Sequence, residues 1–317
     1  MLHKNLETGD RSVSLHLCPL QSVFRNSDLG IPNKILSFAV LLACLIVMYA
    51  AITIISLAGN FLVVWVVKTT RSLQTGINGF IANLAVSDIT LSLFCTPFQF
   101  YAAFKQRWDL PVFMCKFCPF AQTCSVNVSV FTLVAISHDR YMAIMNPMGK
   151  KTSSGKAKVI VIYIWMGSIA LALPAAYFHK FAYINEGSDP LTGNKPFCAL
   201  DTYHVLPQKL SNGTYYEWEG ENTKFKPSQV YQIIVAVLQY GAPFIAMIFQ
   251  YSKMIQIMCA RKVPGNTNEE RDLTIQKSRD KSVKMMIAVV VLFGMCWFPW
   301  HFYHVMSNLS SLFAYFE

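Results

Sequence analysis

Three ionisable residues stand side by side at the end of a long apolar run, in the stretch LVAISHDRYMAIMNP (133–147). His138, Asp139 and Arg140 are either charged anchors where a helix meets a membrane surface, or residues that do chemistry in a buried place. A hydrolase triad made with Ser137 is excluded, because neighbouring residues of a helix point in different directions and nothing nearby supplies an oxyanion site. The segments around this stretch must decide between the two explanations.

The composition of the chain indicates a membrane protein. Of its 317 residues, 54% are hydrophobic and only 14% are charged. In ordinary soluble domains about a quarter of the residues are charged. The net charge of +10 would suit a nucleic-acid-binding protein only if the basic residues shared one folded surface. Lipid, rather than a water-excluded core, is therefore the expected main solvent of this chain.

Six apolar segments are long enough to cross a bilayer, which takes about 20 helical residues. They predict an all-α transmembrane bundle over 35–306, with an extracellular segment over 1–34 and a short extracellular remnant over 307–317. The segment before the first span is polar, so the first span is expected to act as its own targeting signal. The predicted spans are Leu45 to Val67, Asn78 to Phe104, Phe113 to Met145, Val159 to Tyr177, Val230 to Met258 and Val283 to Met306.

The basic residues give the expected orientation of the bundle. With the N-terminus outside, the inner connections hold fifteen Lys and Arg residues against five acidic residues, and the outer segments hold twelve against eleven. An excess of Lys and Arg in cytosolic connections is the usual pattern of membrane proteins. The sequence therefore predicts a multi-pass protein of the plasma membrane with an extracellular N-terminus, and a nucleic-acid partner is disfavoured.

In this orientation Asp139-Arg140-Tyr141 lies at the cytosolic end of the third span, and further motifs accompany it on every other span. Their joint order and spacing resemble the rhodopsin-like G-protein-coupled receptors, from about Leu45 to Met306. His138 departs from the residue that usually precedes Asp-Arg-Tyr in this family. The accompanying motifs are Gly59-Asn60, NLAVSD (83–88), Cys115, Trp165 with Pro174, Pro243 with Tyr251, and FGMCWFPW (293–300).

Within that family, CWFPWHFYH (296–304) and the preceding inner loop (264–286) look most like invertebrate neuropeptide receptors related to those for neuropeptide Y, RYamide, leucokinin and tachykinin. The resemblance implies a seven-helix receptor that signals to a heterotrimeric G protein. After Met306 only eleven residues remain, too few for another span at about 1.5 Å per residue. A truncated receptor that is retained or acts as a dominant negative is therefore the alternative to a signalling one.

The resemblance also implies a signalling switch near the cytosolic side. Arg140 is expected to rest beside Asp139 and to meet Tyr251 when the sixth span swings about Pro299, which removes a backbone hydrogen bond and kinks its helix. Interfacial anchoring of the charges and plain packing of the aromatic residues are the alternatives. The predicted switch residues are Asp139, Arg140, Tyr141, Tyr251, Phe293, Trp297 and Pro299.

Asp88 is a carboxylic acid inside a span, where function is the default hypothesis and a partner should exist. Asn60 and Ser129 are its candidate partners, and the resemblance implies a sodium site formed by the three residues. The alternative is a protonated aspartic acid that is hydrogen-bonded between helices. No other cofactor is expected.

The outer side carries Cys115 and Cys198, where thiols oxidise, and the resemblance implies a disulfide between them. Cys18 is a further outer cysteine of unknown pairing. Asn212 begins an Asn-Gly-Thr glycan acceptor in a long outer loop. The acidic stretch YYEWEGE (215–221) of that loop either is simply solvated or attracts a basic ligand.

The expected ligand is a short, C-terminally amidated neuropeptide. An amine receptor of this family normally places an aspartic acid on the third span below the conserved cysteine position, and Gln122 occupies that position here. Gln99, Gln122, Trp297 and His301 are expected to line the pocket and to exchange hydrogen bonds with the amidated end. His301 is alternatively a histidine that is satisfied between helices.

Other classes are disfavoured. A channel or transporter should show repeats, paired Asn-Pro-Ala loops or an Arg-rich span, and this chain shows none of them. An enzyme should bring together a nucleophile, a base or metal ligands, whereas the seven histidines are scattered. The sequence therefore predicts a receptor rather than an enzyme.

Overall fold

The computed structural model describes residues 31–105, 107–146, 152–184, 195–200, 208–209, 215–216, 227–260 and 269–316. The chain divides into two compact units, Met1–Met48 and Tyr49–Glu317. Helix α2 (Ile31–Thr69) runs through the boundary between them. Cys18, Asn212 and the three glutamic acids of YYEWEGE lie outside the described residues.

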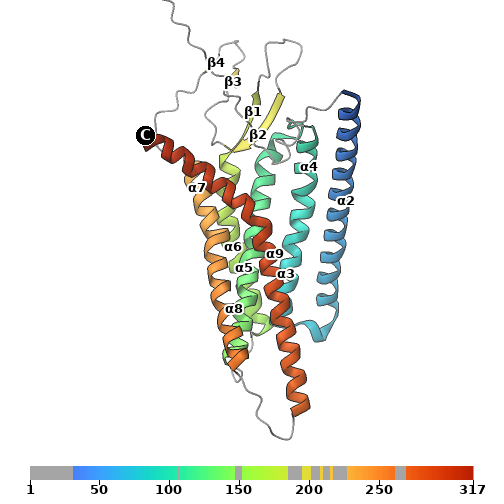
Figure 1. Ribbon diagram of the computed structural model, residues 1–317, viewed down its shortest axis with the longest axis vertical. Coiled ribbons are helices and arrows are strands. Elements are labelled where there is room, and N and C mark those ends of the chain that lie inside the picture. The colour runs from blue at the N-terminus through green and yellow to red at the C-terminus, as the bar shows by residue number, and fades with distance from the viewer. Residues whose placement is uncertain are drawn as a thin grey trace, which may run out of the picture. The chain divides into compact units, whose positions relative to one another are not determined.

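The described part of the second unit is mostly helical, with two small pairs of strands (Figure 1). α9 is a single long helix, so the segment predicted as a remnant over 307–317 is helical as far as Phe316. The remaining elements are η1 (Arg71–Leu73), α3 (Gly76–Phe94), α4 (Thr96–Lys105), α5 (Val112–Met145), α6 (Ser154–Phe178), β1 (His179–Ile184), β2 (Lys195–Leu200), β3 (Gln208–Lys209), β4 (Tyr215–Tyr216), α7 (Pro227–Val235), η2 (Ala236–Gly241), α8 (Ala242–Ala260) and α9 (Glu269–Phe316).

Six helical stretches in the described residues are long and apolar enough to cross a membrane, and they confirm the predicted spans to within a few residues at each end. The second stretch combines α3 with α4, and the fifth combines α7, η2 and α8. The bundle is thus a multi-pass membrane domain of the predicted all-α class. The stretches are Leu42–Thr69, Gly76–Lys105, Val112–Met145, Ser154–Phe178, Pro227–Met258 and Val283–Met306.

α5 is the central helix of the bundle. It packs against α3, α6, α8 and α9, and it contributes more buried residues than any other described element. Its inward positions carry small side chains such as Ala121, Ser125 and Ser129, which let neighbouring backbones approach closely in a lipid environment. Residues near both of its ends can therefore be positioned by this one helix.

The second span is interrupted at Cys95, where the backbone leaves helical geometry (φ −124°, ψ −56°) between α3 and α4. Pro97 follows two residues later and has no backbone N–H to donate. The Thr96 hydroxyl donates to the Leu91 carbonyl at 3.3 Å, and the same carbonyl accepts the Cys95 N–H. The break lets α4 take its own direction, and this direction brings Gln99 to α5.

A strand pair and a disulfide lie at the N-terminal end of α5. β1 and β2 are antiparallel, with Phe181 opposite Cys198, and Cys198 forms a disulfide with Cys115, as the family resemblance implied. At the start of β1, His179 Nδ1 lies 2.6 Å from the Ala175 carbonyl. Burial lowers the pKa of His179, and this hydrogen bond partly offsets the effect.

Candidate functional site

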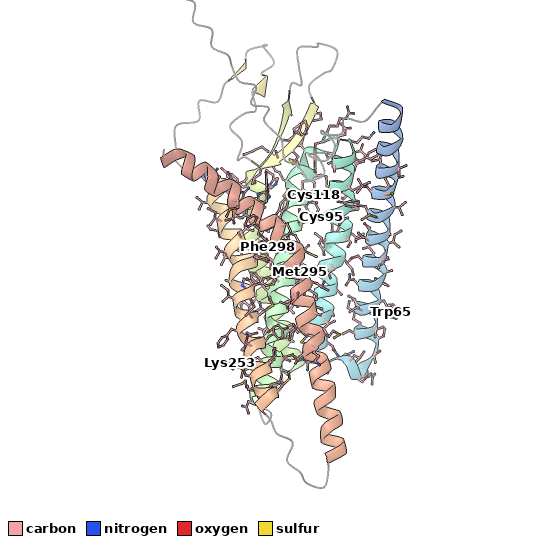
Figure 2. The ribbon with its side chains drawn as sticks, in the orientation of Figure 1. Trp65, Cys95, Cys118, Lys253, Met295 and Phe298 are labelled. Atoms are coloured by element: carbon pink, nitrogen blue, oxygen red, sulfur yellow. A yellow bond between two sulfur atoms is a disulfide. The ribbon has the colours of Figure 1, made fainter. Side chains whose placement is uncertain are left out.

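Two of the predicted pocket residues meet between α4 and α5. Gln99 Nε2 donates a hydrogen bond to Gln122 Oε1. α5 also contacts the break between α3 and α4, where Cys95 and Cys118 lie close together (Figure 2), with the Cys95 thiol 3.6 Å from the Cys118 carbonyl oxygen. This hydrogen bond uses one N–H of Gln99 and one carbonyl lone pair of Gln122, so both side chains keep donors and acceptors for a further partner.

The other two predicted pocket residues belong to an aromatic column on α9. Phe293, Trp297 and His301 follow one another at successive turns, with ring centroids 6.0 Å and 6.1 Å apart. His301 is buried, with 6% of its surface exposed, and its ring lies 5.0 Å from that of Tyr240. α9 changes direction near Phe298 (Figure 2), next to Pro299, which agrees with the kink expected from that proline.

The π-helical segment η2 connects these two groups, and the sequence-based prediction missed it. Gln239 Nε2 donates to the Thr123 carbonyl on α5 at 3.4 Å, and the Tyr240 hydroxyl donates to the Gly294 carbonyl on α9 at 3.1 Å. Short π-helical segments are frequent at functional sites. The available signal was Pro243, which has no N–H to bond the Gln239 carbonyl four residues earlier.

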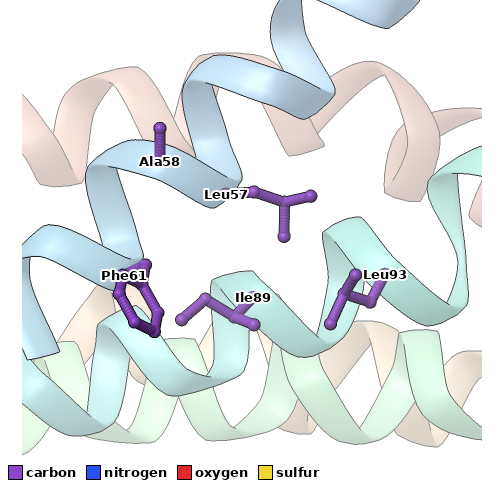
Figure 3. A pocket seen from close by; sticks show the side chains of 5 residues that line it. All are labelled: Leu57, Ala58, Phe61, Ile89 and Leu93. Carbon is purple, nitrogen blue, oxygen red and sulfur yellow. The ribbon is translucent and has the colours of Figure 1, made fainter.

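Two apolar hollows in the described residues lie elsewhere, along α2 and α3. One of about 350 Å³ is lined by Leu57, Ala58, Phe61, Ile89 and Leu93 (Figure 3). A second, of about 510 Å³, continues along α2 to Trp65. Their linings are apolar and contain none of the predicted ligand-binding residues, so they do not suit the polar end of a peptide. The hydrogen-bonded residues of α4, α5, η2 and α9 remain the better candidate for a ligand site.

Asp88 has one of its two predicted partners. The Ser129 hydroxyl donates to Asp88 Oδ1 at 3.4 Å and lies 2.8 Å from the Ser87 hydroxyl. Asn60 instead donates to the Ser56 carbonyl of its own helix at 2.9 Å, and no hydrogen bond joins it to Asp88 among the described residues. A carboxylate and two hydroxyls are the oxygen ligands that a hard cation prefers, so these residues fit a sodium ion.

Asn83 has a role that the sequence did not reveal. Its Nδ2 donates to Thr132 Oγ1 at 2.8 Å, and its Oδ1 accepts from Trp165 Nε1 at 2.8 Å. One side chain therefore joins α3, α5 and α6. The sequence did contain a signal for this role, an amide side chain inside an apolar span. Such a group needs a hydrogen-bond partner within the bundle.

At the other end of α5 the predicted resting pair of Arg140 and Asp139 does not form. The ion pair found in the described part of the chain is between Arg107 and Asp109, at 2.6 Å, and Arg140 Nε is buried without a hydrogen-bond partner. The physical reason is that adjacent residues of a helix diverge in direction. Tyr251 is buried in a cluster that includes Leu133 and Ile144 of α5, and Tyr141 packs against this cluster.

A multi-pass helical bundle with a polar central helix, a disulfide at the N-terminal end of that helix and a kinked sixth span has the architecture of a membrane receptor. A model of the family described as 7 transmembrane receptor (rhodopsin family) matches residues 59–315. The chain belongs to this family, whose members are receptors and not enzymes.

Known receptors are similar over most of the chain. It is 30% identical to the RYamide receptor of Tribolium castaneum over 281 residues. This alignment covers 89% of this chain and 72% of that receptor. It is 30% identical over 260 residues to the tachykinin-like peptides receptor 86C of Drosophila melanogaster (82% and 48%) and 28% identical over 262 residues to the human substance-P receptor (83% and 58%). The chain thus spans less than two thirds of the length of the latter two.

Proposed function

We propose that this chain is a G-protein-coupled receptor for a short, C-terminally amidated neuropeptide. The peptide binds on the outer side of a bundle whose N-terminus is extracellular. Movement of α9 carries the signal to a heterotrimeric G protein on the cytosolic side, and membrane lipid surrounds the bundle. The relatives named above are receptors for RYamide, tachykinin-like peptides and substance P, which supports a peptide as the ligand.

The observation that carries the proposal is the neutral amide pair of Gln99 and Gln122. An amine ligand would bring a positive charge that needs an acidic partner when it is desolvated, and Gln122 occupies the position expected for that acid. A primary carboxamide both donates and accepts hydrogen bonds. The amidated end of a peptide can therefore complete the Gln99–Gln122 pair without burying a net charge.

The aromatic column supports the route of the signal. Trp297 stands between His301, on the outer side, and Phe293, which stacks on Phe244 of α8 with centroids 6.1 Å apart. Pro299 lies within the same stretch of α9. A ligand that presses on Trp297 or His301 therefore acts at the place where α9 is able to bend.

A calcium-flux screen tests the ligand class. Cells that express the chain receive amidated peptides, the same peptides as free acids, and biogenic amines. We expect responses to the amidated peptides, weaker ones to the free acids, and none to the amines. A response to an amine alone would overturn the proposal, and equal potency of amide and acid would remove the role given to the amidated end.

A matched pair of variants tests the site itself. Gln122→Leu is expected to lower the potency of the amidated peptide by about tenfold, the effect of losing one hydrogen bond of about 1.4 kcal/mol. Gln256→Leu is the control, because Gln256 is exposed on α8 and is expected to leave potency unchanged. The loss at Gln122 should shrink when the free-acid peptide is the ligand.

A further inference from the structure

Ser137 is a fully buried polar residue, and it takes no part in the signalling route proposed above. None of its surface is exposed, and its hydroxyl has no hydrogen-bond partner of ordinary geometry among the described residues. Leaving a buried hydroxyl unpaired costs free energy, so a residue of this kind in the middle of a membrane bundle calls for a partner within reach.

Tyr251 of α8 is that neighbour. Its hydroxyl is close enough to interact with the Ser137 side chain, although the geometry falls short of a regular hydrogen bond. Tyr251 is only 7% exposed and packs in one cluster with Leu133 and Ile144. Ser137 lies four residues after Leu133, and these spacings place it on the face of α5 that Tyr251 contacts.

Arg140 occupies the next turn of the same face of α5. It follows Ser137 by three residues and precedes Ile144 by four, and its Nε is buried without a hydrogen-bond partner. The Tyr251 hydroxyl therefore has two candidate partners on one helix: an adjacent serine, and one turn further along a guanidinium group whose Nε has no hydrogen-bond partner among the described residues. Two discrete partners for one group are what a two-state switch requires.

We propose that Ser137 is the resting partner of Tyr251, and that their hydroxyl–hydroxyl hydrogen bond holds Tyr251 away from Arg140. The bond forms by rotation of the serine hydroxyl and a small displacement of the tyrosine. Release of this bond, when α9 and α8 rearrange, lets Tyr251 reach Arg140. The contact is inferred from the burial of both residues and the spacing of Ser137, Leu133 and Ile144 along α5, and its consequence for signalling rests on the proposed function.

A double-mutant cycle on the purified full chain tests the contact. Ser137→Ala and Tyr251→Phe each remove a single oxygen atom, so neither creates a large cavity. Each single substitution is expected to lower the melting temperature by about 2 °C, and the double variant by about the same amount, because one hydrogen bond cannot be lost twice.

Ser168 of α6 provides the control, since it too is fully buried and its hydroxyl has no partner. The shifts of Ser168→Ala and Tyr251→Phe should add. If the shifts of Ser137→Ala and Tyr251→Phe add as well, the proposed contact does not exist and the proposal is overturned.

Signalling without ligand, divided by the amount of receptor at the surface, tests the consequence. Ser137→Ala is expected to raise it about threefold over Ser168→Ala, the population change produced by a hydrogen bond of average strength between membrane helices. The melting-temperature shifts of Ser137→Ala and Tyr251→Phe can fail to add while the resting activity of Ser137→Ala stays unchanged. In a receptor that still responds to its peptide, that result would show that the hydrogen bond does not hold the resting state. If the unaltered chain answers no peptide, the proposed function fails, and the double-mutant cycle still decides the contact.

Discussion

Two regions of the bundle are held together by different kinds of contact. Between α3, α5 and α6 the described residues form hydrogen bonds from helix to helix, through Asn83 and through the Ser87–Ser129 pair. Between α5, α8 and α9 the contact consists mainly of apolar side chains and stacked rings. The buried members of that apolar cluster are Leu133, Ile144, Met247, Tyr251, Met254, Val283 and Val290.

This difference indicates which region can move. A hydrogen bond has a preferred distance and direction, so a network of them specifies one arrangement of helices. Methionine side chains are flexible and repack readily around a displaced neighbour. We infer that α3, α5 and α6 form the fixed part of the bundle and that α8 and α9 are the part that rearranges. Gln122 and Arg140 both belong to α5, at opposite ends of the border between the two parts.

Removing the Asn83 side chain should have the largest effect on stability. Asn83→Ala loses two hydrogen bonds and leaves the Trp165 N–H without its partner, which costs about 2 kcal/mol or more. We expect the melting temperature in detergent to fall by about 4 °C or more. Asn60→Ala is the control, because Asn60 bonds only to Ser56 of its own helix. A smaller fall for Asn83→Ala than for Asn60→Ala would remove the distinction between the two regions.

Gly294 tests the other region through the close approach of α9 to α8. A Cβ atom at this position would lie 2.7 Å from Cε1 of Phe244, and the Phe244 ring is stacked between Tyr240 and Phe293. Gly294→Ala therefore overpacks the contact, at a cost of about 1 kcal/mol or more, and should lower the melting temperature by about 2 °C.

Gly167 of α6 is the matched control, since nothing lies within 4 Å of a Cβ atom built there. Gly167→Ala should leave the melting temperature unchanged or raise it slightly, because alanine favours helix. An unchanged melting temperature in Gly294→Ala would show that α9 shifts without cost, and would make this region even more adaptable than we infer.

The sequence was sufficient for the parts of the fold that depend on composition and length. The six spans follow from apolar runs, and the Cys115–Cys198 disulfide follows from the family resemblance. The π-helical segment was not predicted, because it needs the packing of Tyr240 and Gln239 against two other helices to offset its irregular hydrogen bonds. Local sequence carries no record of that packing.

The site residues divide in the same way. Gln99 and Gln122 were predicted individually, but their hydrogen bond depends on the break at Cys95, which sets the direction of α4. The pairing of Asp139 with Arg140 was expected as part of the switch that the family resemblance implies, and it does not form because helix geometry separates adjacent side chains. The sequence identified the types of residue at the site, but not the directions in which their helices and side chains point in the folded protein.

The smallest expected effect belongs to a conservative change within the apolar cluster. Met254 is fully buried in contact with α5 and α9. Leucine has nearly the same volume, so Met254→Leu should cost less than about 1 kcal/mol and shift the melting temperature by less than about 2 °C. Leucine is also branched and has fewer rotatable bonds, so it adapts less readily when α9 is displaced.

Met254→Leu should therefore change the mobility of α9 without changing the stability of the protein. Hydrogen exchange of the α9 amides, measured by mass spectrometry, should slow while the melting temperature stays nearly constant, because opening between α8 and α9 requires side chains that follow the motion. Met114→Leu, next to the disulfide in the cluster at the outer end of α5, should leave the exchange of α9 unchanged. A fall in melting temperature as large as that of Asn83→Ala would instead mean that the apolar cluster specifies its packing as strictly as the hydrogen-bonded helices do.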